Sequence, residues 1–302
     1  MKIAISGLGR MGAQIARKLA EDGHDVIAHN RSREPVDEAA KHGANVAYEK
    51  SDVVRAFSNE GVVLWIMLPA EIIDSQLDDW LNIIPKNSII IDGGNSRFEL
   101  DKARAQKIES RGSSYVDVGT SGGIWGYENG FSMMVGGNKE AFNKIESALV
   151  TLSKPTGGYH YFGSYGAGHF VKMVHNAVEY GIMESLAEGY RILKEGPYEN
   201  LDLAAAGQVW QQNSVVTSWL NELARQVLSD NPDLTGISGE VAETGEARWT
   251  LELAKKMDIA MPSIQASFDV RLESQKGDTN YATKLLAAIR NKFGGHDLNP
   301  NK

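Results

Sequence analysis

The feature that most constrains this chain is a glycine run near its start, Gly7-Leu8-Gly9-Arg10-Met11-Gly12. Residues 2–6 before it are typical of a buried strand, and residues 10–22 have the apolar spacing of a helix. In such a turn the first glycine permits a tight reversal, the second lets a phosphate approach the backbone, and the third allows close packing of helix on strand. The helix start adds amide donors. We therefore predict a dinucleotide-binding turn, with an ordinary glycine-rich turn as the alternative.

The same alternation continues through the first half of the chain. Strands are expected over residues 2–6, 25–29, 62–68, 88–92 and 115–118, with weaker candidates over 131–135 and 160–162. Helices are expected over residues 10–22, 74–81 and 97–111. Strands that alternate with helices imply a mostly parallel sheet covered on both faces, which is a Rossmann-type α/β domain.

The pattern changes near Pro155. Residues 156–168 hold five glycines and predict a connector. Helices are then expected over residues 169–195, 201–210, 216–229, 245–257, 261–273 and 281–293, followed by a tail with helix-breaking residues. We predict a dinucleotide-binding domain over residues 1–165 and an all-α domain over residues 166–302.

Composition and charge exclude several classes of protein. The chain has 302 residues with a net charge of −8, which argues against nonspecific binding of nucleic acid. It has no cysteine, so thiolate metal sites are excluded, and no His/Asp/Glu group has metal-ligand spacing. No apolar run reaches the ~20 residues of a membrane span, and no signal-peptide pattern is visible. We expect a soluble cytoplasmic protein without membrane or nucleic-acid partners and with metal-free chemistry.

The residues after the second predicted strand bear on which dinucleotide binds. An NAD site usually has Asp or Glu there for the ribose hydroxyl, but this chain has Asn30-Arg31-Ser32-Arg33. Two guanidiniums and a hydroxyl suit a 2′-phosphate, which favours NADP with Asn30, Arg31 and Ser32 as contacts. If Arg31 stacks on adenine and Arg33 is only a surface charge, NAD remains possible.

A polar stripe begins the first long helix of the second half. Lys172, His175, Asn176 and Glu179 lie at i, i+3, i+4 and i+7, which places them on one helical face. The alternative is a solvated face, but His and Asn are poor choices for an exposed helix surface. The stripe also starts where the two predicted domains meet, a usual place for ligands. Its lysine and glutamate are suited to proton transfer.

Several motifs together resemble one family. Asp92-Gly93-Gly94-Asn95-Ser96 closes a predicted strand, Gly119-Thr120-Ser121-Gly122-Gly123 follows another, and residues 169–181 carry the pattern KMVHNxxEYG. The chain resembles the decarboxylating 6-phosphogluconate dehydrogenases in their short-chain form, within the β-hydroxyacid dehydrogenase superfamily. The resemblance covers the chain from the first glycine motif to the tail.

The resemblance implies roles for the stripe. Lys172 matches the general base that takes the proton of the substrate's C3 hydroxyl, and Glu179 matches the acid that protonates C1 after carbon dioxide leaves. Tyr180 matches a phosphate contact. The matching substrate-holding positions are Asn95, Ser121, Gly122, Gly123, His175 and Asn176.

The resemblance also implies phosphate ligands. Arg248 and Thr250 lie where many members have Lys-Trp-Thr, so the cation is kept but its shape differs. Arg271 is a weaker match to a phosphate arginine. Arg290 and His296 match a tail motif that reaches a neighbouring subunit's site, which implies a homodimer or homotetramer; a fraying terminus is the alternative.

The resemblance also implies contacts with the dinucleotide. Leu68 and Pro69 resemble a loop that contacts it, and Asn95 matches a position that contacts it as well. The family often has glycine where this chain has Glu71.

The expected activity is oxidative decarboxylation of 6-phosphogluconate to ribulose 5-phosphate with reduction of NADP, or of NAD, as in the pentose phosphate pathway and gluconate utilisation. A non-decarboxylating β-hydroxyacid dehydrogenase and a catalytically silent NADP-binding sensor are the alternatives. The cations Arg248, Arg290 and His296 argue against the first, and the Lys172/Glu179 pair argues against the second.

Overall fold

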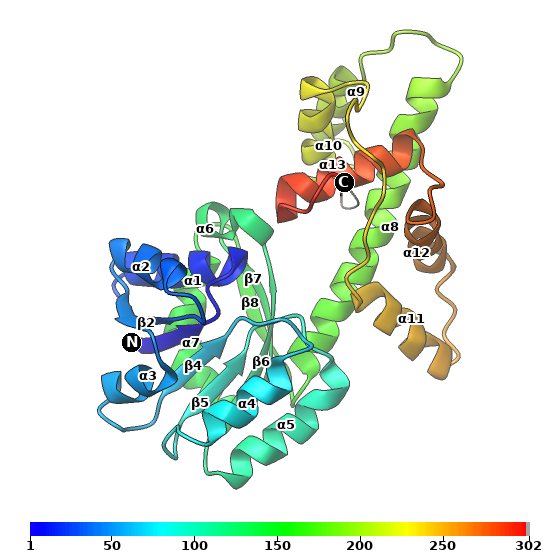
Figure 1. Ribbon diagram of the computed structural model, residues 1–302. Helices are drawn as coiled ribbons and strands as arrows, with labels where there is room; N and C mark the ends of the chain where they lie inside the picture. Colours follow the sequence, from blue (N-terminus) through cyan, green and yellow to red (C-terminus); the bar gives the residue numbers. More distant parts are fainter. Residues whose placement is uncertain (300–302) are drawn as a thin grey trace. The chain divides into compact units, whose positions relative to one another are not determined.

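The computed structural model describes residues 1–299 (Figure 1). The chain divides into two compact units, one over Met1–Met173 and one from Val174 onward. The long helix α8 (Ala167–Glu195) begins in the first unit and continues into the second.

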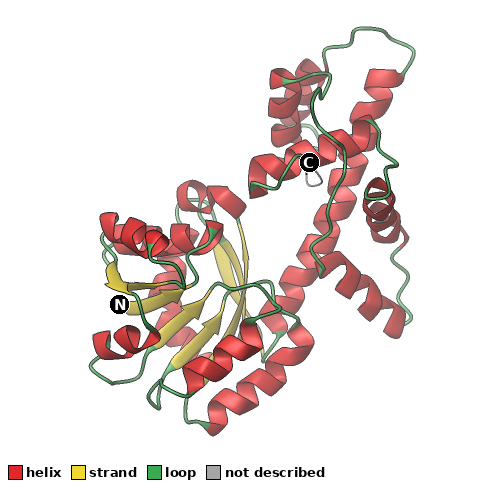
Figure 2. Ribbon diagram, viewed as in Figure 1, coloured by secondary structure: helices red, strands yellow, loops and turns green. Residues whose placement is uncertain are grey.

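The first unit is an α/β structure around one eight-stranded sheet, in the order β3-β2-β1-β4-β5-β6-β7-β8 (Figure 2). Its strands are β1 (Lys2–Ser6), β2 (Asp25–His29), β3 (Asn45–Ala47), β4 (Val63–Ile66), β5 (Ile89–Asp92), β6 (Ser114–Ser121), β7 (Ser132–Gly137) and β8 (Gly158–Gly163). Its helices are α1 (Arg10–Glu21), α2 (Glu34–Lys41), α3 (Lys50–Ala56), α4 (Ile73–Leu81), α5 (Phe98–Ser110), a 3₁₀ turn η1 (Gly123–Trp125), α6 (Gly126–Asn129) and α7 (Lys139–Ser153).

The predicted Rossmann-type domain with a mostly parallel sheet is confirmed. Only the β6–β7 pair is antiparallel, because residues 122–131 between them are too few for a crossover connection. The weaker strand candidates over residues 131–135 and 160–162 are confirmed as parts of β7 and β8, and β8 occupies much of the segment that was also predicted to be a connector. The prediction also missed β3, α2, α3 and α7; β3 is a short edge strand with two exposed residues, so it shows no apolar run.

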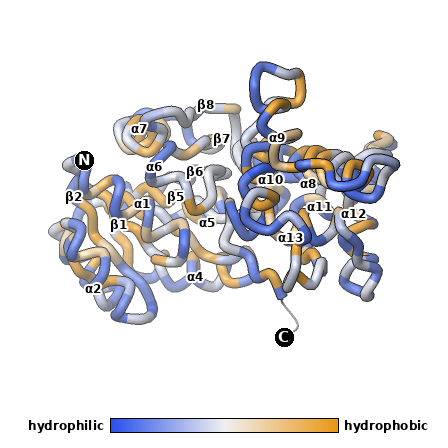
Figure 3. The backbone as a smooth tube through the Cα atoms, turned by 90° about the horizontal axis from the view of Figure 1, so that it is seen from above, coloured by the Kyte–Doolittle hydropathy of each residue, from blue (hydrophilic) through white to orange (hydrophobic). Residues whose placement is uncertain are grey.

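Alternating side chains of the central strands fill the two faces of the sheet. Ile3 and Ile5 of β1 belong to one buried cluster with Ile15 of α1, whereas Ala4 packs on the opposite face with Leu64. Figure 3 shows apolar residues following the buried strands, β1 among them. Strands buried on both faces are expected in a parallel sheet.

The second unit is helical throughout its described residues, as predicted. Besides most of α8 it contains α9 (Leu203–Gln211), α10 (Trp219–Asp230), α11 (Glu246–Lys256), α12 (Pro262–Ser274) and α13 (Tyr281–Gly294). Side chains of Asp202, Ser218 and Asn280 accept amide hydrogen bonds at the starts of α9, α10 and α13, which ends each preceding loop. Within residues 1–299, no helix is long and apolar enough to cross a membrane. The last three residues of the predicted tail lie outside the described part.

A buried charged cluster lies in the first unit at the start of α8. His169 Nδ1 is 2.7 Å from Asp101 Oδ2, and Arg104 Nη1 is 3.2 Å from Asp101 and 3.6 Å from Asp92. The sequence shows no metal-ligand spacing, yet folding brings ligand atoms of Asp92, Asp101 and His169 within 4.8 Å of one another. Because Arg104 and a protonated His169 together supply two cations to these two carboxylates, the cluster balances its own charge.

The cluster makes stability dependent on pH. Burial lowers the pKa of His169, but the neighbouring carboxylates of Asp101, Asp92 and Asp117 outweigh it and raise the pKa to about 9. A raised pKa stabilises the fold fully below the unfolded value of 6.5, and this stabilisation is lost as pH rises through about 9.

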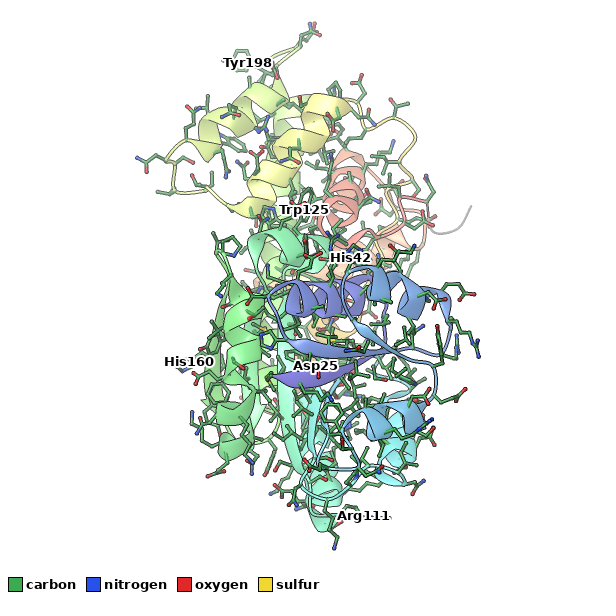
Figure 4. The ribbon with its side chains drawn as sticks, turned by 90° about the vertical axis from the view of Figure 1, so that its left-hand side faces the viewer. Asp25, His42, Arg111, Trp125, His160 and Tyr198 are labelled. Carbon is green, nitrogen blue, oxygen red and sulfur yellow. The ribbon has the colours of Figure 1, made fainter. Side chains whose placement is uncertain are left out.

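We predict that wild type loses on the order of 2 kcal/mol relative to His169→Gln between pH 6.5 and 9.5, measured by unfolding at each pH. The control is His160→Gln, at an exposed histidine that points outward from β8 (Figure 4). Equal pH profiles for wild type and His169→Gln would refute the role of this ion pair.

Candidate active site

The glycine turn between β1 and α1 is open on its outer side. Gly7 has φ +99°, and a Cβ on it would lie 2.4 Å from the Met67 carbonyl oxygen, so only glycine fits. A Cβ on Gly12 would lie 2.0 Å from the Gly7 carbonyl oxygen. On Gly9, by contrast, a Cβ would meet no atom of the described residues within 4 Å. This geometry fits a phosphate that approaches the backbone at Gly9 and the start of α1.

Three predicted cofactor segments meet at the carboxyl edge of the sheet. β1 lies between β2 and β4, so the chain leaves β1 toward one side and returns on the other. At such a switch point open α/β sheets bind ligands. Leu68 follows β4, and a Cβ on Gly94 after β5 would lie 2.6 Å from the Leu68 carbonyl oxygen. The segments that hold the glycine turn, Leu68-Pro69 and Asn95 are therefore neighbours.

The segment after β2 is tied to the glycine turn through Asn30. The Leu8 N–H donates to Asn30 Oδ1 at 3.0 Å, and Asn30 Nδ2 donates to the Ser32 carbonyl oxygen at 3.3 Å. Arg33 is exposed, and its guanidinium lies 4.7 Å from the ring centre of Tyr48. Among residues 1–299, no carboxylate pairs with Arg31 or Arg33. These exposed cations fit a 2′-phosphate. Sequence reasoning missed Tyr48, which lies just after β3.

Lys172 is held against strand β6. Only 6% of Lys172 is exposed, and a Cβ added to Gly119 would lie 2.2 Å from the Lys172 Cβ. The absence of a side chain at Gly119 thus lets α8 approach the strand closely at the lysine. A buried lysine beside a glycine strand is a suitable place for a base.

Asp117, two residues before Gly119 on the same face of β6, caps the start of α8. Its carboxylate accepts the N–H groups of Gly166 at 2.9 Å, of Gly168 at 2.8 Å and of His169 at 3.1 Å. Burial raises the pKa of Asp117, while His169 and the amide donors act in the opposite direction. Sequence reasoning missed Asp117; its one signal was a carboxylate inside an apolar strand.

The predicted substrate-holding positions of the first unit lie at the end of β6 and on the loops that follow β5 and β6. Asp92 Oδ2 accepts the Ser96 hydroxyl at 2.7 Å, and Asp92 Oδ1 accepts the Gly94 N–H at 3.1 Å, so the buried carboxylate fixes the loop that exposes Asn95. Ser121 ends β6, and Gly122-Gly123 follow it into η1.

The second unit contains the rest of the polar stripe. His175, Asn176 and Glu179 are half-buried, so the fully solvated alternative does not describe them. Asn176 Oδ1 lies 3.0 Å from His175 Nδ1, and Asn176 Nδ2 donates to Glu246 Oε1 at 2.9 Å. Glu246 is buried at the start of α11 and orients the stripe. Sequence reasoning missed it because it lies seventy positions away from Asn176.

Two buried guanidiniums surround Tyr180. Arg271 is 1% exposed and its guanidinium carbon lies 3.2 Å from the ring centre of Tyr180. Arg290 is 5% exposed, and its charge interacts with Tyr180 and Glu179 of its own chain. Burial lowers the pKa of Arg271 to about 10 and also lowers that of Arg290. Within the described residues neither guanidinium has a carboxylate within 4.0 Å. Glutamates such as Glu179 interact with both from a greater distance, so the region still offers two buried cations to an anion.

The other predicted phosphate ligands are placed differently. Arg248 is exposed, and its guanidinium donates to Glu243 Oε1 at 2.6 Å. The buried Thr250 hydroxyl donates to the Glu246 carbonyl oxygen at 2.8 Å within its own helix. His296 follows α13, and its carbonyl oxygen accepts Asn291 Nδ2 at 2.7 Å. The structure therefore groups Arg271, Arg290 and Tyr180, and it gives Arg248 a carboxylate partner.

A Rossmann-type sheet with an open glycine turn, followed by a helix that carries a buried lysine, defines a dehydrogenase that binds a nicotinamide dinucleotide. Residues 2–164 match the family described as the NAD binding domain of 6-phosphogluconate dehydrogenase, and residues 168–299 match its C-terminal domain. The chain belongs to the 6-phosphogluconate dehydrogenase family, and the resemblance found in the sequence is confirmed.

Named relatives agree with this family. A Haloferax volcanii protein named NAD(+)-dependent, decarboxylating 6-phosphogluconate dehydrogenase is 35% identical over 99% of this chain and 98% of its own length. A rice decarboxylating 6-phosphogluconate dehydrogenase is 31% identical over 94% of this chain, which matches 63% of that longer protein. The Plasmodium falciparum enzyme, solved with NADP+ and with 6-phosphogluconate, is 25% identical with a TM-score of 0.82, covering 100% of this chain and 67% of that one.

The contact between Gly119 and Lys172 can be tested by substitution. Gly119→Ala places a methyl group where α8 now packs, so we predict a loss of turnover of about 100-fold from displacement of Lys172, with NADP+ affinity changed little. Steady-state kinetics and a binding titration measure the two effects. Gly158→Ala is the control on the same sheet, because a Cβ there meets nothing within 4 Å of the described residues. Wild-type turnover in Gly119→Ala would contradict the positioning role of β6.

Proposed function

We propose that this chain catalyses the oxidative decarboxylation of 6-phosphogluconate to ribulose 5-phosphate and carbon dioxide, with NADP+ preferred and NAD+ accepted. The observation that carries the proposal is the pair of buried guanidiniums, Arg271 and Arg290, beside Tyr180 and without a carboxylate partner in residues 1–299. The family and the substrate named for the Plasmodium relative support the same assignment.

The phosphate end of the substrate is bound by the second unit. Arg271 and Arg290 supply fixed positive charge in a desolvated region, where an anion gains more than it would in water. The Tyr180 hydroxyl accepts the Thr244 N–H at 3.2 Å, which fixes the ring on which Arg271 stacks. Arg248, Thr250 and His296 are proposed as further phosphate contacts, and Arg248 would exchange Glu243 for the substrate.

The sugar-acid end is bound along α8. Lys172 Nζ takes the proton of the C3 hydroxyl as C3 is oxidised. A nicotinamide dinucleotide held at the glycine turn would supply the hydride acceptor for that oxidation. The Lys172 ammonium then donates a hydrogen bond to the new C3 carbonyl oxygen and stabilises the enolate that forms as the C1 carboxylate leaves as carbon dioxide. Glu179, seven positions further along the helix, delivers a proton to the carbon that carried the carboxylate.

The remaining predicted residues orient the substrate and the dinucleotide. Hydroxyl and carboxylate groups of the substrate are held by Asn95, Ser121, Gly122, Gly123, His175 and Asn176. The dinucleotide is held by Gly7, Leu8, Gly9, Arg10, Met11, Gly12, Asn30, Arg31, Ser32, Leu68, Pro69 and Asn95. The lack of a carboxylate partner for Arg31 and Arg33 within residues 1–299 supports the preference for NADP+.

We also propose a cytoplasmic homodimer or homotetramer. Exposed apolar side chains gather along α8 and the loop before α10, where Val178, Ile182, Val215 and Val216 are exposed and line one apolar pocket of the second unit. An apolar patch of this kind is typical of a subunit contact.

An absorbance assay at about 340 nm tests the reaction, with carbon dioxide measured in parallel. We expect NADP+-dependent reduction with 6-phosphogluconate, stoichiometric carbon dioxide, and little activity with gluconate, because Arg271 and Arg290 need the phosphate. Reduction without carbon dioxide would instead indicate a β-hydroxyacid dehydrogenase. Cofactor binding with no turnover of 6-phosphogluconate would indicate a silent sensor.

The base can be tested on its own helix. Lys172→Ala is expected to lower kcat by at least ~100-fold while the Kd of NADP+ stays near wild type, because the lysine serves the proton transfer. Lys194→Ala is the matched control, since Lys194 lies on the same helix and pairs with Asp233 at 2.7 Å on the surface. Near-wild-type kcat in Lys172→Ala would remove Lys172 from the mechanism.

A further inference from the structure

The short helix α6, which directly follows the Ser121–Gly123 loop, is attached to one face of α1. The Tyr127 N–H donates to Gln14 Oε1 at 3.2 Å, and Lys18 Nζ donates to the Tyr127 carbonyl oxygen at 2.5 Å. The Tyr127 hydroxyl donates to Glu21 Oε2, and the Arg17 guanidinium lies 4.2 Å from the Tyr127 ring centre. One residue of α6 therefore contacts four residues of the helix that follows the glycine turn.

This attachment is needed because α6 cannot hold its position alone. It has four residues, and one helical turn is unstable in isolation. Its far end is anchored where the Asn129 carbonyl oxygen accepts the Thr156 hydroxyl at 2.7 Å. The near end leads back through η1 to Gly122, which has φ +129°. Tyr127 is the residue of α6 through which this near end is tied to α1.

The attachment also reaches the glycine turn. Gln14 uses both ends of its amide: its oxygen accepts from Tyr127, and its Nε2 donates to the Arg10 carbonyl oxygen at 3.1 Å. Arg10 begins α1 beside the open side of Gly9. A continuous set of contacts, Arg10–Gln14–Tyr127, thus joins the phosphate-binding turn to the segment that carries the substrate loop.

We propose that Tyr127 is a positioning residue that couples dinucleotide binding to substrate binding. A dinucleotide that orders the start of α1 also restrains Tyr127, and so sets Ser121–Gly123 before the substrate arrives. The loss of conformational entropy on ordering this segment then occurs when the dinucleotide binds. The substrate therefore binds more tightly to the dinucleotide complex than to the free protein. Coupling of this kind is reciprocal, so substrate must tighten the dinucleotide to the same extent. The inference rests on the proposed function in taking Ser121–Gly123 as a substrate loop.

The test measures the Kd of NADP+ by calorimetry on the full chain, with and without saturating 6-phosphogluconate, under conditions where turnover is prevented by the Lys172→Ala background. In that background we expect 6-phosphogluconate to tighten NADP+ by about 5-fold or more. Adding Tyr127→Ala should reduce this factor to below about 2. Adding Tyr127→Phe, which keeps the ring over Arg17 but loses the Glu21 hydrogen bond, should give an intermediate factor.

Tyr159→Phe and Tyr159→Ala are the matched controls, because the Tyr159 hydroxyl in the same unit donates to Glu146 of α7 at 3.2 Å rather than to a residue of α1. They should leave the coupling factor unchanged. If Tyr127→Ala lowers only the unfolding temperature and keeps the full factor, Tyr127 is merely structural and the proposal is wrong. If 6-phosphogluconate does not bind at all before Tyr127 is changed, and wild type does not turn it over, the proposed function fails and this inference with it.

Discussion

The site depends on how α8 is fixed to strand β6. One face of the strand presents a buried carboxylate at Asp117 and a bare backbone at Gly119. The carboxylate accepts three amides at the start of the helix, which anchors its first turn, and the glycine lets Lys172 lie against the strand one turn later. Because α8 is a regular helix, this anchor also fixes the positions along it of His175, Asn176 and Glu179. The close approach of the two backbones therefore sets where Lys172, the proposed base, lies against β6.

The two units differ in whether their buried cations have carboxylates close by. In the first, Arg104 and His169 are matched by Asp92 and Asp101, so the cluster is balanced and serves stability. In the second, Arg271 stacks on the Tyr180 ring, and within the described residues neither Arg271 nor Arg290 has a carboxylate within 4.0 Å, although Glu179 interacts with both from a greater distance. Buried charge without a partner is costly. Under the proposed function, the phosphate of the substrate is the close anionic partner that these two arginines lack.

Sequence reasoning succeeded where the signal is local. The glycine turn, most strand and helix positions and the stripe on α8 all depend on spacings of a few residues. It failed for Asp117, Glu246, Tyr48 and Tyr127. Each of these acts through a partner far along the chain, as Glu246 does on Asn176 and Tyr127 on Glu21. The periodicity of a single sequence does not indicate which residues far apart in the chain will be in contact. The short edge strand β3 was missed for a related reason, because exposed residues leave no apolar pattern.

The sequence by itself determined the class of fold, the place of the dinucleotide turn and the helical face that carries Lys172 and Glu179, because strand and helix periods are written in neighbouring residues. Only the tertiary structure decided which cations are buried together and which are already paired. In the sequence Arg248 is the better match and Arg271 the weaker one, but packing places the first beside Glu243 at the surface and buries the second against Tyr180. That difference depends on burial and on partners distant in sequence, which are properties of the folded chain alone.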